Sequence, residues 1–136
     1  MDVQLANIWV AAGIILGFEV TWFTWRISRE VKMAGKRERT WLPPADIVNL
    51  IAMVVIAIGV FILPILGLID IDLVKRLFAL AVLIFVGYPF ALAGHYQLFS
   101  AKRKEKQTRC SFQERIVLLV IAALTVIYIV LWAIIG

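Results

Sequence analysis

The chain has 136 residues, of which 63% are hydrophobic and only 17% are charged, so it has too little polar surface to cover a soluble globular domain. Its net charge of +5 would suit nucleic acid, but the basic residues stand in short segments between long hydrophobic runs, which argues against that partner. Four continuous runs of about 20 residues or more predict four membrane-spanning helices, since a bilayer core needs about 20 helical residues. A membrane β-barrel would show alternating segments of about 10 residues instead.

The distribution of the basic residues predicts the orientation. Twelve of the fourteen lie in segments 26–39 and 102–115, and the other two are Lys75 and Arg76. The positive-inside rule makes both segments cytoplasmic loops and places both termini outside. We therefore expect an all-α integral membrane protein of the cell membrane, with its four helices in one antiparallel bundle and no further domain.

The first predicted span covers residues 3–27. Trp9 is expected at the outer headgroup level, and Trp22 and Trp25 at the inner one, because indole rings favour the membrane interface. The start Met1-Asp2 has no basic segment before the hydrophobic run, so we expect the span to remain in the protein rather than to be a cleaved signal.

Three residues of this span are candidates for contacts or function. Gly13 and Gly17 form a Gly-x-x-x-Gly pair, which lets another helix approach closely. Glu19 is a carboxylate within the hydrophobic run, and it points away from the glycine pair at about 100° per residue. Polar groups at such depth usually face the bundle interior and find partners.

Beyond the span, the helix is expected to continue into the first basic segment and to stop at Gly35, a residue that tolerates the left-handed conformation. Arg37 and Arg39 have two interpretations. They are either residues of a solvated loop or contacts to anionic lipid headgroups, each contributing about 1 kcal/mol. Lys102, Arg103 and Lys104 of the second basic segment have the same two interpretations.

The second predicted span, residues 44–67, begins with Pro44 and Asp46, which suit the first turn of a helix. Asn49 is its strongly polar side chain, and Pro64 is expected to kink the helix or loosen its last turns. A tight outer turn follows. Asp72 is the preferred N-cap of the third span, with Asp70 second.

The third predicted span covers residues 73–99. Gly87, Ala91 and Gly94 share one face, which predicts close packing against another helix. The fourth, residues 112–135, is preceded by a capping box in which Ser111 and Glu114 serve the helix start near Phe112. Cys110 is the single cysteine and cannot form an internal disulfide.

Glu19, Asn49 and His95 are expected at similar depth, in the cytoplasmic third of the membrane. At 1.5 Å per residue, Glu19 lies about 10 Å inside Arg26 and His95 about 10 Å inside Lys102. Asn49 lies about 7–8 Å inside Pro44. Glu19 paired with His95 is the favoured contact. Three interpretations are open. The first is a structural role, either as a hydrogen-bonded layer or with Glu19 as a carboxylate at the membrane interface. The second is a site for a proton, a cation or a polar ligand, and the third is that the three side chains do not meet.

The residue supply argues against most catalytic sites. One histidine and one cysteine cannot build a His/Cys metal cluster, and no phosphate-binding loop or nucleophile motif is present. We expect no cofactor, no bound metal and no enzymatic activity. The expected function is a structural or accessory membrane subunit, as a homo-oligomer or within a larger complex; the alternative is a small proton- or cation-coupled transporter or channel that uses Glu19.

Overall fold

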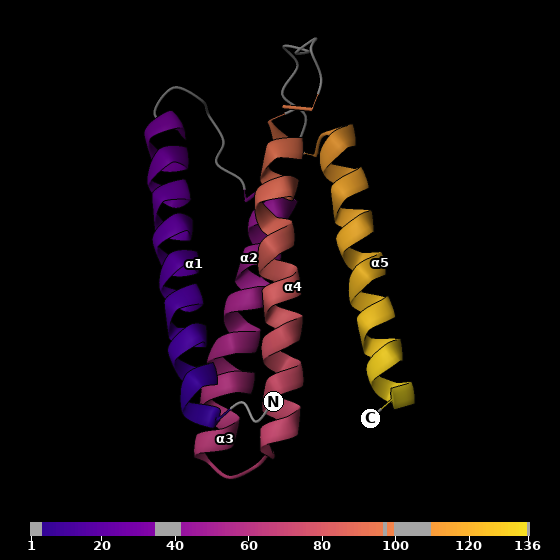
Figure 1. The fold of residues 1–136 in the computed structure, drawn as a ribbon. Coiled ribbons are helices and arrows are strands. Elements are labelled where there is room, and N and C mark those ends of the chain that lie inside the picture. The colour runs from indigo at the N-terminus through magenta and orange to yellow at the C-terminus, as the bar shows by residue number, and fades with distance from the viewer. Residues whose placement is uncertain (1–3, 35–41, 97, 100–109, 136) are drawn as a thin grey trace. The chain divides into compact units, whose positions relative to one another are not determined.

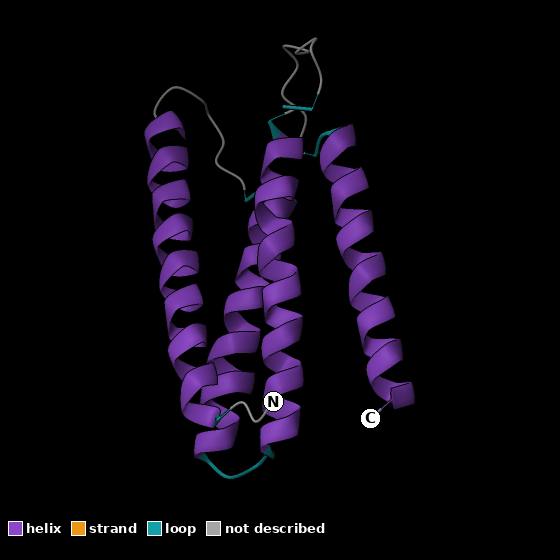
Figure 2. Cartoon of the chain, viewed as in Figure 1, coloured by secondary structure: helices purple, strands orange, loops and turns teal. Residues whose placement is uncertain are grey.

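The computed structural model describes residues 4–34, 42–96, 98–99 and 110–135, and within these ranges it is helical and has no strand (Figures 1 and 2). Four stretches are long and apolar enough to cross a membrane, which confirms that part of the predicted fold. The stretches are Leu5–Lys32, Pro44–Ile65, Ile71–His95 and Phe112–Ile134. The elements are α1 (Leu5–Ala34), α2 (Pro44–Val54), the π-helical segment η1 (Val55–Ile62), α3 (Leu63–Ile65), α4 (Ile71–His95) and α5 (Phe112–Ile135).

The chain divides into two compact units. The first combines Met1–Leu42 with Met53–Phe78, and the second combines Pro43–Ala52 with Ala79–Gly136. The first unit therefore contains α1, η1 and α3, whereas the second contains α5. Helices α2 and α4 contribute residues to both units.

The turn after α3 follows from one glycine. Gly67 has a positive φ of 67°, which a residue without Cβ adopts at little cost. Its N–H donates to Pro64 O at 3.0 Å, and the next N–H, of Leu68, donates to Leu63 O at 3.0 Å. These two bonds form a Schellman motif, which satisfies carbonyls at the end of the helix.

The N-cap of α4 differs from the preferred prediction. The helix begins at Ile71, and Asp70 Oδ1 accepts a hydrogen bond from the Leu73 N–H at 2.7 Å. Asp70 is therefore the cap, and the preference for Asp72 was wrong. Asp72 lies one turn before Lys75 and pairs with its Nζ at 2.9 Å, because it is already inside the helix.

In the first unit, α1 contacts η1 through Trp9. The indole Nε1–H donates to Val60 O at 2.8 Å, and the ring centroid lies 6.4 Å from that of Phe61. Val60 is four residues before Pro64, which has no N–H to donate to that carbonyl. The indole therefore supplies a donor at the position where the proline removes one, a role that its assignment as an interface marker did not predict.

Replacing Trp9 with Phe keeps an aromatic ring but removes this donor from a partly buried carbonyl. We expect the free energy of unfolding to fall by about 1 kcal/mol, measured by detergent titration with far-UV circular dichroism. Trp22→Phe is the control, because Trp22 is exposed. Equal effects of the two substitutions would contradict the role of the indole N–H.

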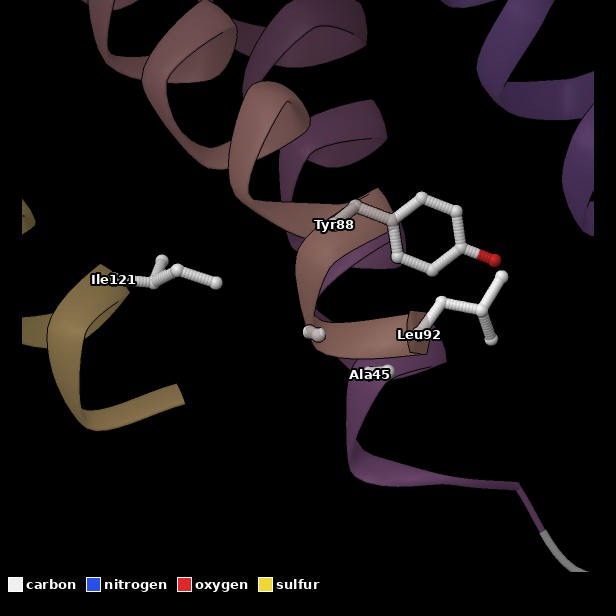
Figure 3. Close-up of a cluster of buried hydrophobic side chains, with 5 residues drawn as sticks. Ala45, Tyr88, Leu92 and Ile121 are labelled. Atoms are coloured by element: carbon white, nitrogen blue, oxygen red, sulfur yellow. The ribbon is translucent and has the colours of Figure 1, made fainter. Parts of the chain in front are cut away.

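The core of the second unit lies between α2, α4 and α5. It contains Ala45, Tyr88, Ala91, Leu92 and Ile121, and Figure 3 shows Ile121 reaching from α5 toward α4. Gly87 provides the space: a Cβ placed there would lie 2.6 Å from Ile121 Cγ1. The absence of a side chain at this position thus lets α5 lie close to α4 within the unit.

Candidate functional site

The fourth candidate span begins with a complete capping box. The Glu114 N–H donates to Ser111 Oγ at 3.0 Å, and the Ser111 N–H donates to Glu114 Oε2 at 3.3 Å. Helix α5 starts at Phe112, between the two residues, as the motif predicted. Both Ser111 and Glu114 are buried, so the motif satisfies polar groups away from solvent.

The Glu114 carboxylate also receives donors from two other segments of the second unit. Oε1 accepts from the Ala45 N–H, in the first turn of α2, at 3.1 Å. Oε2 lies 2.9 Å from His95 Nδ1, at the end of α4. One carboxylate therefore joins the ends of α2, α4 and α5. We call Ala45, Gly94, His95, Ser111 and Glu114 the Glu114 cluster.

Helix α4 approaches the cluster closely because of Gly94. The Ser111 hydroxyl donates to Gly94 O, and a Cβ at Gly94 would lie 2.9 Å from the backbone nitrogen of Glu114. Since the obstructing atom belongs to the backbone, only a glycine fits without displacing α5. The hydrogen bonds of the cluster therefore depend on the absence of this one side chain.

Within the cluster, His95 and Glu114 form a pair that is either an ion pair or a hydrogen bond between an imidazole and a carboxylate. The Glu114 side chain is fully buried, and that of His95 is 8% exposed. An ionised carboxylate only accepts hydrogen bonds, so with Glu114 in that form the imidazole donates through Nδ1. Three donors to one carboxylate stabilise its charged form in place of water.

A second buried pair lies in the same unit. The Tyr88 hydroxyl of α4 donates to Asp46 Oδ1 of α2 at 2.9 Å. Tyr88 also contributes its ring to the core shown in Figure 3. Asp46, which the sequence suggested only as a favourable charge in the first turn of the helix, thus also joins α2 to α4.

Cys110 precedes the capping box and is partly buried. Burial raises the pKa of its thiol, and the negative charge of Glu114 raises it further. The thiolate is the reactive form of cysteine. The environment of Cys110 therefore disfavours reactivity at neutral pH.

Two residues of the predicted polar layer, Glu19 and Asn49, are buried and His95 is partly buried, but the three do not belong to one unit. Glu19 is in the first unit, whereas Asn49 and His95 are in the second. His95 contacts Glu114, a residue that the sequence suggested only as a cap. The predicted pairing of Glu19 with His95 and the convergence of the layer stay predictions.

The predicted packing residues have different surroundings. Gly87 and Gly94 lie against α5, and Ala91 is fully buried in the core of the second unit. A Cβ at Gly13 would lie 4.0 Å from the Phe61 ring, and one at Gly17 would meet no atom within 4 Å. The predicted stop at Gly35 and the predicted lipid contacts lie outside the described residues; the latter are Arg37, Arg39, Lys102, Arg103 and Lys104.

Only the local half of this site is recognisable from the sequence. The Ser-x-x-Glu spacing indicates contacts within one helical turn, but neither the Ala45 N–H nor His95 is recognisable as a partner from its neighbours in the chain. The one available signal was that His95, like Glu114, stands at the boundary between a hydrophobic run and the same basic segment. In a hairpin of two helices, the end of the first helix and the start of the second lie close in space. Glu114 is therefore a candidate partner for His95.

Among the described residues, no group of three or more His, Cys, Asp or Glu side chains has an arrangement that could hold a metal ion. Comparison with known proteins found no matching protein-family model, no matching curated protein and no matching solved structure. The geometry of the chain itself is therefore the basis for a functional interpretation.

Proposed function

We propose that the chain is a multi-pass protein of the cell membrane with a non-catalytic, structural or accessory role. The observation that carries this proposal is the Glu114 cluster. Its buried carboxylate receives three donors from within the chain, which join three helix ends. A carboxylate engaged in this way stabilises a particular packing of helices and has fewer positions left for a substrate.

The proposed topology is an antiparallel bundle with both termini outside and both basic segments cytoplasmic. It is supported by the placement of twelve of the fourteen basic residues in segments 26–39 and 102–115. Such a protein has two kinds of partner: the bilayer, including anionic headgroups near the basic segments, and other membrane helices. The second kind comprises copies of the same chain or the subunits of a larger complex.

Crosslinking in intact membranes, followed by extraction in a gentle detergent, tests the accessory role. We expect one recurrent crosslinked species, either a homo-oligomer or a complex with a defined second protein, which persists through purification. An unrelated four-span protein expressed at the same level is the control for random collisions. Recovery of monomer alone at every crosslinker length would contradict the proposal.

Labelling of Cys110 tests the topology. We expect an impermeant maleimide, added outside intact cells, to leave Cys110 unlabelled, and to label it after permeabilisation at alkaline pH. Because its pKa is raised, the labelling rate should keep rising with pH beyond the point where that of glutathione levels off. Labelling in intact cells would contradict the orientation. If the labelling rate of Cys110 reached half its maximum at a pH equal to or below that for glutathione, the effect of burial and of Glu114 on the pKa would be contradicted.

A second candidate function is a proton- or cation-coupled transporter or channel that uses Glu19. The observation that favours it is that Glu19, a carboxylate, lies within a candidate span and is fully buried there. Carboxylates within spans commonly mark ion or proton pathways. Glu19→Gln should then abolish proton-linked flux in reconstituted vesicles, whereas Asp72→Asn, at an exposed carboxylate of α4, should leave it unchanged. Equal flux with and without Glu19 would remove this function.

A further inference from the structure

Three large apolar side chains are exposed where α4 ends and α5 begins. Leu98 and Phe99, just beyond α4, are 71% and 57% exposed, and Phe112, the first residue of α5, is 77% exposed. We call these three residues the apolar end. Exposed apolar side chains that gather at one place are typical of surfaces that contact a membrane or another protein.

A hydrogen bond shows where the apolar end lies along α5. The Phe99 N–H donates to Gln113 Oε1, in the first turn of α5, at 3.3 Å. Gln113 directly follows Phe112 in the chain. Phe99 and Phe112 therefore lie at the same end of the two helices, at the start of the candidate span Phe112–Ile134.

The backbone donors of Leu98 and Phe99 have acceptors within the chain, although both residues lie beyond the helix. The Leu98 N–H donates to Ala93 O at 3.0 Å, and the Phe99 N–H has the Gln113 side chain. Water serves as the acceptor for such groups at a hydrated helix end, whereas in hydrocarbon each donor needs a partner in the protein. This pairing suits a helix end that touches hydrocarbon.

The exposed surface of Phe112 continues along α5. Ile116 and Leu119 follow it at intervals of four and three residues, so the three positions fall within about 60° of one another around the helix. Ile116 is 46% and Leu119 is 70% exposed, and both belong to the candidate span. This continuity favours acyl chains over a protein partner, because lipid that covers Leu119 also reaches Phe112.

Arg115 is an exposed basic residue in the same turn of α5. Its side chain interacts with the thiol of Cys110, which precedes the helix. The guanidinium therefore reaches toward the start of the helix rather than toward the middle of the span. Long basic side chains commonly lie along apolar surface in this way while the charged group stays at the membrane interface.

We propose that the apolar end contacts the acyl chains of phospholipids, so that the boundary of the hydrocarbon lies at Phe112 or beyond it. Glu114, two residues farther along α5, then lies about 3 Å inside this boundary. Lipid as well as protein separates the Glu114 cluster from water, and the donors of the chain replace the water that a carboxylate otherwise binds. The proposal rests on the proposed membrane location and assigns lipid as the partner of a defined surface.

Spin labelling tests the proposal. Leu98→Cys, Phe99→Cys and Phe112→Cys are made one at a time in a Cys110→Ser chain, labelled with a nitroxide and reconstituted in phosphatidylcholine vesicles. Collisions of the nitroxide with oxygen, which concentrates in hydrocarbon, are compared with collisions with a nickel chelate, which stays in water. We expect a high ratio of oxygen to nickel collisions at all three positions.

Two labelled positions provide matched controls. Leu119→Cys lies in the candidate span and is exposed to a similar extent as Leu98 and Phe112, so it gives the ratio for hydrocarbon. Asp72→Cys replaces an exposed carboxylate at the start of α4 and gives the ratio for a hydrated helix end. The apolar end should match Leu119→Cys and exceed Asp72→Cys.

A second measurement distinguishes lipid from protein as the cover. The same cysteine variants are labelled with bimane and reconstituted with phosphatidylcholine that carries a nitroxide on its acyl chain. We expect the bimane at Phe99 and Phe112 to emit at the shorter wavelength found at Leu119 and to be quenched by this lipid to the same extent. Far-UV circular dichroism of each labelled variant shows that the helices are retained.

The outcomes separate this proposal from the proposed membrane location. Nickel collisions at the apolar end as frequent as at Asp72 would show that it lies in water and would overturn the proposal. Few collisions with either reagent and no quenching by the labelled lipid would show that protein, such as a second copy of the chain, covers it, which also overturns the proposal. In both cases a high ratio at Leu119 leaves the membrane location standing, whereas a low ratio at Leu119 would overturn both.

Discussion

Glu114→Ala is expected to lower the free energy of unfolding by about 2–4 kcal/mol, the largest effect of any single side-chain truncation in the second unit. The substitution removes an acceptor that serves the Ala45 N–H, the Ser111 N–H and His95. A buried donor left without its partner costs about 1–3 kcal/mol, and removal of one member of a buried pair is costly for the same reason. Unfolding by detergent titration, followed by circular dichroism, measures the change.

Graded substitutions distinguish this network from a simple loss of volume. Glu114→Gln keeps one acceptor oxygen, so it should cost less than Glu114→Ala. The double variant Glu114→Ala/His95→Ala should be more stable than the sum of the single effects implies, because the two side chains contact each other. Asp72→Ala, at an exposed ion pair, is the control and should change stability by less than about 1 kcal/mol. Additive effects of Glu114 and His95 would contradict the contact between them.

Gly94→Ala is the second substitution with a large expected effect. The added Cβ would lie 2.9 Å from Glu114 N and 3.0 Å from Glu114 Cα, both backbone atoms that cannot rotate away. Helix α5 would have to move, which lengthens the hydrogen bonds of the Glu114 cluster. We expect a loss of about 1–3 kcal/mol from overpacking, measured in the same titration.

Two other glycines provide matched controls for Gly94. The Cβ added by Gly87→Ala meets the side chain of Ile121 rather than backbone atoms. Shortening that side chain in the double variant Gly87→Ala/Ile121→Val should therefore restore part of the stability. Ile121→Val should not rescue Gly94→Ala. Gly17→Ala meets nothing within 4 Å and should be neutral or slightly stabilising, since alanine has the higher helix propensity. A destabilisation by Gly17→Ala as large as that by Gly94→Ala would mean that helix contacts do not explain the effect.

Features that depend on hydrophobic length and local motifs were predictable. Four helical stretches follow from the lengths of the hydrophobic runs, and the start of α5 follows from Ser111 and Glu114, since both halves of a capping box lie within one turn. The local sequence does not determine whether Asp70 or Asp72 is the N-cap of α4. Either carboxylate can cap a helix that begins just after it, so the cap depends on the helix start that the turn allows.

Features that depend on distant contacts were not predictable from the pattern. The indole of Trp9 donates to Val60 O across 51 positions of the chain, although the proline that leaves this carbonyl without a helical donor is visible in the sequence. The contact of His95 with Glu114 rather than with a more deeply placed carboxylate depends on the packing of α4 against α5 in the second unit. Spacing and hydropathy specify which segments are buried, but not which polar groups meet.

The bond from the Ala45 N–H to Glu114 has a consequence for biosynthesis. The acceptor is 69 residues later in the chain than the donor. At about 5–20 residues per second, a ribosome makes Glu114 about 3–14 s after Ala45. During that interval the start of α2 lacks this acceptor, so the second unit is completed only after α5 has been made. A chain truncated before α5 should consequently remain a substrate for membrane quality control, whereas the full-length chain should escape it.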